Sequence, residues 1–146
     1  NSPKNINGVE SFAGKEGLNA AISNTNFIVN ILPLTDDTEG ILNKDFFAQC
    51  SAHTVLVNVG RGAHLDEKDL LIAIEEKQIK EAYLDVFVEE PLPENHPFWT
   101  NKNIYVTPHI ASVTNATTAL KQVADNYNRM KNNETLLNEV SLERGY

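Results

Sequence analysis

Strand-like and helix-like segments alternate along this chain, and this alternation limits the possible folds more than any other feature. Residues 54–59 form a nearly continuous apolar run, a pattern typical of a strand buried on both faces. Further strands are predicted at 27–32, 82–87 and 104–107, and helices at 16–23, 44–50, 67–76 and 115–132. Such alternation predicts an α/β fold, with a parallel sheet, right-handed crossovers and helices on both faces.

Local signals support several of the predicted helices. Asn43 and Asp66 each stand directly before a helical segment, where a side-chain oxygen can accept hydrogen bonds from unpaired backbone amides. In the last predicted helix, apolar residues recur at a spacing typical of a buried face, namely Leu120, Val123, Ala124 and Tyr127. We therefore expect this helix to contribute to a core.

Composition excludes several functional classes. The 146 residues suggest one domain, and a formal net charge of −8 disfavours nucleic-acid binding because it repels phosphate backbones. The longest apolar runs are too short to cross a membrane. The single cysteine, Cys50, excludes an intrachain disulfide and fits a reducing, cytoplasmic location. Because His53, His64 and His96 lack metal-ligand spacing, we predict no metal site and assign these histidines structural or surface roles.

Ionisable side chains lie at or beyond the carboxyl ends of the predicted strands: Arg61, Asp85, Glu90 and His109. Ligands of parallel α/β sheets bind at that edge. A fixed cation, a carboxylate and a titratable imidazole can together hold an anionic substrate and move one proton. Taken singly, each residue has an ordinary alternative: a surface arginine, a strand-end cap, a solvated loop carboxylate like Glu89, or a buried structural histidine.

The glycines beside Arg61 allow two interpretations. Gly60-Arg61-Gly62 precedes a cap and a helix, as a phosphate-binding loop does, but Leu65 stands where the third glycine of G-x-G-x-x-G would be. We favour a tight turn that exposes Arg61, in which the glycines allow positive φ and the close approach of a ligand.

Three motifs follow one another in order: Leu-Val-Asn-Val-Gly-Arg-Gly at 56–62, Leu-Asp-Val-Phe-Val-Glu-Glu-Pro at 84–91 and Thr-Pro-His-Ile-Ala at 107–111. Arg61 and Glu90 are 29 residues apart, and Glu90 and His109 are 19 residues apart. In this order and spacing the chain resembles the D-isomer-specific 2-hydroxyacid dehydrogenases. Segments 8–14 and 143–146 look most like the glyoxylate/hydroxypyruvate reductase A branch. The resemblance implies a Rossmann-like nucleotide-binding domain.

The resemblance implies catalytic roles for three residues. Arg61 would bind the substrate carboxylate and polarise the adjacent carbonyl. His109 would act as general acid and give a proton to the carbonyl oxygen as hydride reaches carbon. Glu90, which directly precedes Pro91, would hydrogen-bond the imidazole, fix its orientation and favour its protonated form. The implied reaction is NAD(P)-dependent reduction of small 2-oxo acids, such as glyoxylate and hydroxypyruvate, to 2-hydroxy acids.

The resemblance also implies a dinucleotide site, in which Asp85 would lie beside the nicotinamide carboxamide. Residues 1–4 would meet the adenosine ribose, where an acidic residue would favour NAD; these residues include Lys4 and no acid, so NADP is favoured and NAD is the alternative. The residues assigned to the cofactor are Ser2, Lys4, Leu32, Pro33, Leu34, Thr38, Val59, Gly60, Arg61, Asp85 and His109.

Full members of the family are longer than this chain and contain a substrate domain. We therefore expect 1–146 to be the C-terminal portion of a dinucleotide-binding domain without its first βαβ unit, with 115–146 returning toward the substrate domain. We expect the isolated chain to be inactive and the full-length enzyme to be a homodimer. The alternatives are a related activity, on phosphoglycerate, lactate or formate, and a non-catalytic module for association or nucleotide binding.

Overall fold

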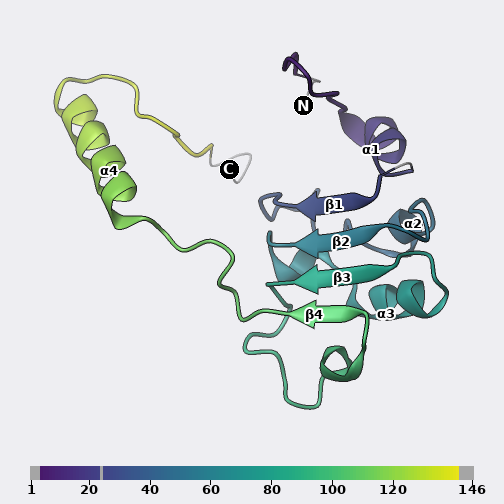
Figure 1. Ribbon diagram of the computed structural model, residues 1–146. Coiled ribbons are helices and arrows are strands. Elements are labelled where there is room, and N and C mark those ends of the chain that lie inside the picture. The colour runs from purple at the N-terminus through teal and green to yellow at the C-terminus, as the bar shows by residue number, and fades with distance from the viewer. Residues whose placement is uncertain (1–3, 24, 142–146) are drawn as a thin grey trace. The chain divides into compact units, whose positions relative to one another are not determined.

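The computed structural model describes residues 4–23 and 25–141, in two units that we treat separately, 1–109 and 110–146. The first unit holds four strands: β1 (Phe27–Asn30), β2 (Val55–Asn58), β3 (Glu81–Leu84) and β4 (Ile104–Val106) (Figure 1). Its helices are α1 (Gly14–Ile22), α2 (Lys44–Phe47), α3 (Glu67–Glu75) and the short 3₁₀ helices η1 (Gly62–His64) and η2 (Pro97–Thr100). The second unit contains α4 (Ala116–Lys131).

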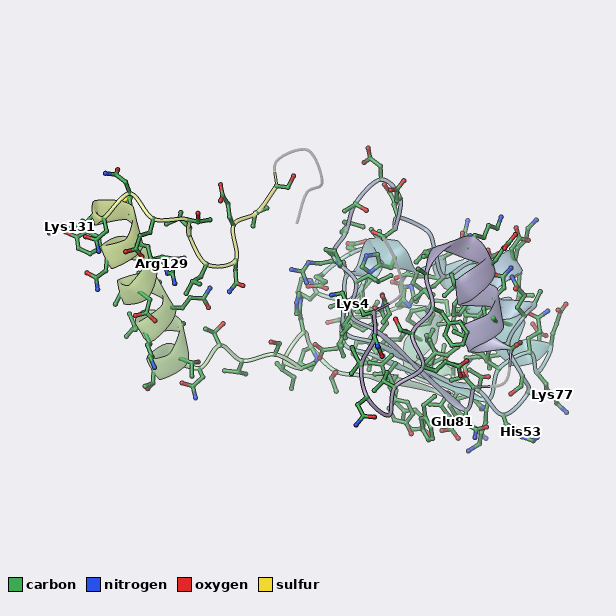
Figure 2. All side chains as sticks on the ribbon, turned by 90° about the horizontal axis from the view of Figure 1, so that it is seen from above. Lys4, His53, Lys77, Glu81, Arg129 and Lys131 are labelled. Carbon is green, nitrogen blue, oxygen red and sulfur yellow. The ribbon has the colours of Figure 1, made fainter. Side chains whose placement is uncertain are left out.

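The four strands form one parallel sheet in the order β1-β2-β3-β4, so each strand pairs with its neighbour in the chain. Their arrowheads point the same way, and all four carboxyl ends therefore lie at one edge (Figure 1). The opposite edge holds the amino ends, with Glu81 at the start of β3 and His53 just before β2 (Figure 2). The predicted parallel α/β sheet is confirmed.

The two faces of the sheet differ in burial. One cross-strand row belongs to the hydrophobic core or packs against it: Ile28, Leu56, Ala82 and Ile104. The same core receives side chains from the three helices, among them Ile22, Phe46, Phe47, Leu70 and Ala73. The adjacent row points to the opposite face and is exposed or half-buried: Val29, Val57, Tyr83 and Tyr105.

Helices thus cover one face of the sheet in the described residues of this unit, rather than the two faces predicted. The reason is topological. The strands are joined in their spatial order, and right-handed crossovers that all step in one direction place their helices on the same side.

Capping residues begin the helices where the sequence indicates. The Asn43 side chain accepts hydrogen bonds from the amides of Asp45 and Phe46 at the start of α2. Asp66 accepts from the amides of Lys68 and Asp69 at the start of α3. Both predicted caps are confirmed.

Strand β3 ends at Leu84, earlier than the predicted residue 87. The amide of Asp85 still bonds to a neighbouring strand, at the carbonyl of Asn58, but the amide of Phe87 donates to the carboxylate of Glu90 instead. A local side chain has therefore replaced the strand ladder as the partner of this backbone.

The second unit consists of α4 and the segment that follows it. Asn115 caps α4 by accepting hydrogen bonds from the amides of Thr117 and Thr118. After the helix the chain folds back, and the Asn126 side chain both donates to and accepts from the backbone of Leu137. A helix and one short segment provide no second layer within the unit, and no residue of α4 is buried. The expected core packing is therefore wrong, in the described residues, for Leu120, Val123, Ala124 and Tyr127.

None of the helices in the part of the chain that is described is both long enough and apolar enough to cross a bilayer.

Gly62 lies where two loops of the first unit meet. A Cβ atom on Gly62 would lie 1.9 Å from both the carbonyl carbon and the carbonyl oxygen of Phe87, so no side chain fits there. Neither Gly60 nor Gly62 uses the positive φ that a glycine allows. What requires a glycine at position 62 is the close approach of another backbone segment.

We predict that Gly62→Ala lowers the free energy of unfolding by about 1–3 kcal/mol, the usual cost of forcing extra volume into packed structure. The clash is with backbone atoms, which cannot rotate away as a side chain can. Equilibrium urea denaturation measures the change.

Gly17→Ala is the matched control, because a Cβ there would meet its nearest neighbour, Phe12 Cβ, at 3.2 Å, a tight contact rather than the overlap at 1.9 Å that Gly62 would have. An equal loss of stability in the two variants would contradict the steric explanation.

Candidate active site

Arg61 stands just beyond the carboxyl end of β2, and its side chain is exposed. Its backbone is held from within the protein: the amide donates to His64 Nδ1 at 3.1 Å, and the carbonyl accepts from Asn58 Nδ2 at 3.3 Å. Arg61 Nη1 donates to the carbonyl of Gly60 at 2.7 Å. This bond keeps the guanidinium beside the turn, and its remaining N–H groups can serve an anionic ligand.

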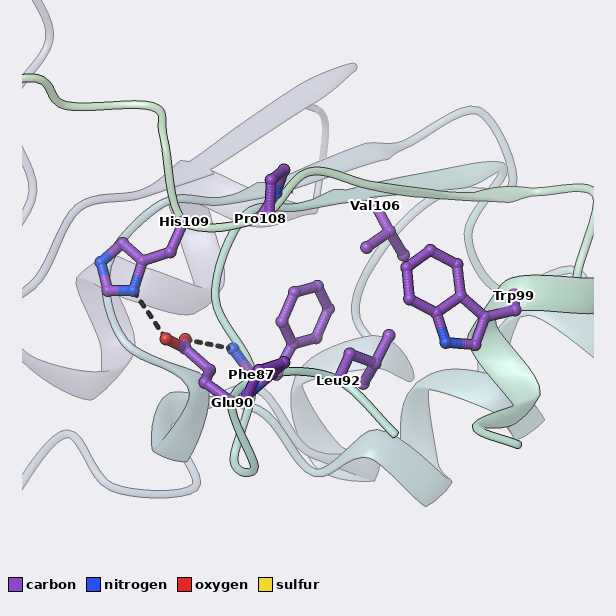
Figure 3. A pocket seen from close by; sticks show the side chains of 8 residues that line it. Phe87, Glu90, Leu92, Trp99, Val106, Pro108 and His109 are labelled. Atoms are coloured by element: carbon purple, nitrogen blue, oxygen red, sulfur yellow. Dashed lines mark hydrogen bonds and ion pairs between the residues drawn. The ribbon is translucent and has the colours of Figure 1, made fainter. Parts of the chain in front are cut away.

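His109 and Glu90 meet across two loops. Glu90 lies in the loop after β3, His109 lies beyond β4, and His109 Nδ1 is 2.8 Å from Glu90 Oε2 (Figure 3). The other carboxylate oxygen, Glu90 Oε1, accepts from the amide of Phe87 at 3.0 Å. The structure therefore brings Glu90 to the imidazole, as the sequence motif indicates.

Two hydrogen bonds lower the pKa of Glu90. The bond from His109 contributes most, and the bond from the Phe87 amide comes next. Both favour the charged carboxylate over the protonated acid. The Glu90 side chain is 38% exposed, so water screens the effect. With Nδ1 directed at this carboxylate, Nε2 is the nitrogen of His109 that can give a proton to a ligand.

The backbone of His109 is strained, with a φ of 53° in the left-handed region. A residue other than glycine costs roughly 1–2 kcal/mol in that conformation. Such conformations persist where the surroundings hold them, and they cluster at functional sites. Here the His109 amide donates to the carbonyl of Thr107 at 3.1 Å, and the ring is bonded to Glu90.

A cavity of about 590 Å³ opens beside the pair of ionisable side chains. Its walls are mostly apolar, and Glu90 and His109 also line it (Figure 3). The apolar lining residues are Phe87, Pro91, Leu92, Trp99, Val106 and Pro108. Trp99 Nε1 donates to the carbonyl of Pro93 at 2.8 Å, which fixes the indole against the cavity. The cavity therefore offers a ligand an apolar wall beside the imidazole and the carboxylate.

Asp85 directly follows β3 and is 4% exposed. Its amide donates to the carbonyl of Asn58 at 3.0 Å, and the hydroxyl of Thr107 donates to its Oδ1 at 2.6 Å. Asp85 thereby joins the ends of β2, β3 and β4. These bonds give Asp85 a strand-end role, and its expected place beside the nicotinamide carboxamide stays a prediction.

The residues assigned to the adenosine side of a cofactor follow β1. Leu32 and Leu34 are 42% and 43% exposed, and Pro33 is exposed between them. The hydroxyl of Thr38 bonds within this loop, since it donates to the Pro33 carbonyl at 2.7 Å and accepts from the Thr35 amide at 2.8 Å. The Thr38 side chain therefore stabilises the conformation of the loop that follows β1.

The remaining cofactor assignments fall at the end of β2 and near the N-terminus. Val59 is half-buried and Gly60 is buried. The amide of Lys4 donates to Ser11 Oγ at 2.8 Å, and Lys4 is exposed. Ser2 lies outside the described residues.

Three buried polar residues behind this edge were not assigned to the site: Asn30, Asn58 and His64 are at most 5% exposed. The available signal was that Asn30 and Asn58 interrupt apolar strand segments. His64 is buried, so of the two roles predicted for it, structural or surface, the structure supports the structural one. No cluster of three or more His, Cys, Asp or Glu side chains in residues 4–23 and 25–141 could hold a metal ion.

Comparison with known proteins agrees with this geometry. The family profile described as "D-isomer specific 2-hydroxyacid dehydrogenase, NAD binding domain" matches residues 2–111. The chain is 47% identical over 145 residues to glyoxylate/hydroxypyruvate reductase A of Yersinia enterocolitica, covering 99% of this chain and 46% of that relative. It thus spans about half the length of the curated relatives it matches.

Two solved structures carry the same fold. The 2-hydroxyacid dehydrogenase from Xanthobacter autotrophicus in complex with NADPH and MES has a TM-score of 0.94 at 39% identity, over 99% of this chain and 60% of that chain. The NADPH-dependent glyoxylate/hydroxypyruvate reductase from Sinorhizobium meliloti in complex with NADP and sulfate has a TM-score of 0.92 at 36% identity, over 99% of this chain and 47% of that chain. These likenesses confirm the Rossmann-like class. The chain belongs to the D-isomer specific 2-hydroxyacid dehydrogenase family and contains that family's NAD-binding domain.

Proposed function

We propose that this chain is the nucleotide-binding portion of an NADP-dependent reductase that converts glyoxylate or hydroxypyruvate to the 2-hydroxy acid. The observation that carries the proposal is the 2.8 Å contact between His109 Nδ1 and Glu90 Oε2, at the sheet edge that also carries Arg61. The substrate class is supported by the names of the Yersinia and Sinorhizobium relatives.

Arg61 binds the carboxylate of the 2-oxo acid in this proposal. A guanidinium presents a planar fork of donors that matches a carboxylate and stays charged at all relevant pH values. Its exposed position beyond β2 gives a small anion access to that fork. The same cation polarises the adjacent carbonyl and so favours attack at its carbon.

His109 supplies the proton that the carbonyl oxygen needs as the bond to carbon forms. Glu90 holds Nδ1, so the proton is delivered from Nε2. Glu90 is itself held by the Phe87 amide, and the ring cannot turn away without breaking the pair.

The described residues fit a dinucleotide at this edge. Exposed Leu32 and Leu34 provide an apolar surface for adenosine, and the backbone of Val59 and Gly60, just beyond the end of β2, would face the nicotinamide. Bound NADPH would supply the hydride. NADP rather than NAD is supported by the basic Lys4 and by the NADPH and NADP present in the two structural relatives.

The chain spans about half of its curated relatives, so the proposed activity belongs to the full-length protein. The isolated chain would lack most of the substrate pocket and be inactive. We further propose that residues 115–146 return toward the substrate domain and that the full-length enzyme is a cytoplasmic homodimer.

We predict that the full-length protein oxidises NADPH in the presence of glyoxylate or hydroxypyruvate, and that His109→Ala lowers kcat by about 10²–10⁴-fold, the usual contribution of a general acid. The loss of NADPH absorbance measures both. His53→Ala is the control, because His53 is exposed at the amino ends of the strands and should leave turnover unchanged.

Undiminished turnover in His109→Ala would contradict the assignment of the acid. Turnover only with NADH and another 2-oxo acid would contradict the reductase assignment while leaving the family membership intact.

We predict that the Glu90 carboxyl titrates below the ordinary range of glutamate and that His109→Ala moves its midpoint upward, because the largest stabilising hydrogen bond is lost. The pKa of Glu90 is lower in the folded protein than in the unfolded chain. The pair therefore stabilises the fold above the ordinary glutamate pKa, and this contribution disappears as pH falls through the lowered value. Carbon-13 NMR of the side-chain carboxyl measures the midpoint.

Glu89→Gln is the control for this titration and should not move the Glu90 midpoint. A Glu90 midpoint that is the same with and without the imidazole would show that the two groups do not interact in solution.

A further inference from the structure

A buried polar network lies behind Arg61 and joins two loops of the sheet edge. Asn30, Asn58 and His64 are 5%, 0% and 0% exposed. Asn30 Nδ2 donates to Asn58 Oδ1 at 2.9 Å and to His64 Nδ1 at 2.8 Å. Three residues from β1, β2 and η1 thus share one set of hydrogen bonds in the interior.

The two ring nitrogens of His64 face different segments. Nδ1 accepts from the Arg61 amide at 3.1 Å as well as from Asn30. Nε2 lies 3.2 Å from the carbonyl of Pro33. Because Nδ1 receives two N–H donors, the ring proton sits on Nε2 and is donated to Pro33.

The two asparagines hold the same two segments. Asn58 Nδ2 donates to the carbonyl of Arg61 at 3.3 Å, and Asn58 Oδ1 also accepts from the Gly60 amide at 3.2 Å. Asn30 Oδ1 accepts from the amide of Leu32 at 3.2 Å. Every outward bond of the network therefore ends on backbone of the Arg61 turn or of the loop after β1.

The network leaves no room for a side chain at position 60. A Cβ on Gly60 would lie 3.0 Å from both Asn30 Nδ2 and His64 Nδ1. A buried, fully paired polar cluster fixes one arrangement of its members, because leaving any one of them unpaired is costly.

We propose that Asn30, Asn58 and His64 are positioning residues for the reaction, and that the two nitrogens of His64 divide the task. His64 Nδ1 positions Arg61 and thereby the 2-oxo acid, and His64 Nε2 positions Pro33 and thereby the cofactor. The inference rests on the proposed function, which assigns Arg61 to the substrate carboxylate and the loop after β1 to the dinucleotide.

Two substitutions of His64 separate these tasks in the full-length enzyme. His64→Asn keeps an acceptor where Nδ1 stood and loses the donor to Pro33, so the KM for NADPH should rise about tenfold, the effect of one lost buried hydrogen bond, with little change in the KM for glyoxylate. His64→Gln keeps a donor toward Pro33 and loses the acceptor, so the KM for glyoxylate should rise about tenfold instead.

His53→Asn and His53→Gln, at an exposed histidine, are the matched controls and should change neither KM. A rise of the same KM in both His64 variants, or equal changes in both constants, would overturn the division of tasks. If neither His64 variant folds, Asn58→Ser is the substitute, because it removes the donor to the Arg61 carbonyl. It must raise the KM for glyoxylate and leave the KM for NADPH unchanged. Equal rises in the two KM values would overturn the proposal.

A wild-type enzyme that turns over no 2-oxo acid would refute the proposed function and not the network. In that case NADPH binding by calorimetry must weaken in His64→Asn alone, and the amide signal of Arg61 must shift more in His64→Gln. The reverse pattern, or no difference between the variants, overturns the positioning role.

Discussion

The common direction of the four strands places their carboxyl ends at one edge of the sheet, and the arrangement of the site depends on this constraint. Arg61 leaves β2, Glu90 leaves β3 and His109 leaves β4, so three loops with ionisable side chains start side by side. Backbone contact then brings two of these loops together, because Gly62 has no side chain to keep Phe87 away. Phe87 in turn holds Glu90, and Glu90 holds the imidazole.

The polar groups buried at this edge are paired with one another by hydrogen bonds. Every fully buried side-chain nitrogen or oxygen in the described residues has a hydrogen-bond partner. Asp85 and Thr107 link the ends of β3 and β4, and Asn30 and Asn58 link the ends of β1 and β2. The apolar core on the helix side stabilises the sheet, while these paired polar groups fix where its loops go.

Local signals made much of the first unit predictable. The caps at Asn43 and Asp66 and the positions of the strands depend on neighbouring residues, so the sequence contains them directly. The choice of Glu90 over Glu89 came from a motif; its physical reason, the Phe87 amide and the His109 ring, is visible only in the structure.

The features that the sequence did not reveal depend on partners distant along the chain. Gly62 contacts Phe87, and His64 contacts Asn30, through the fold alone. The spacing of Leu120 and Val123 correctly indicates one apolar stripe on α4, but spacing says nothing of what covers such a stripe.

The most direct test of the central claim, that one sheet edge holds both the anion-binding cation and the proton donor, is a crystal structure of the full-length protein with NADP and oxalate. Oxalate has the carboxylate of glyoxylate and cannot accept hydride. The account predicts that the Arg61 guanidinium donates to one carboxylate and that His109 Nε2 lies within about 2.6–3.2 Å of an oxygen of the other, with Nδ1 still bonded to Glu90. Oxalate bound away from Arg61, or an imidazole turned away from both Glu90 and the ligand, would contradict it.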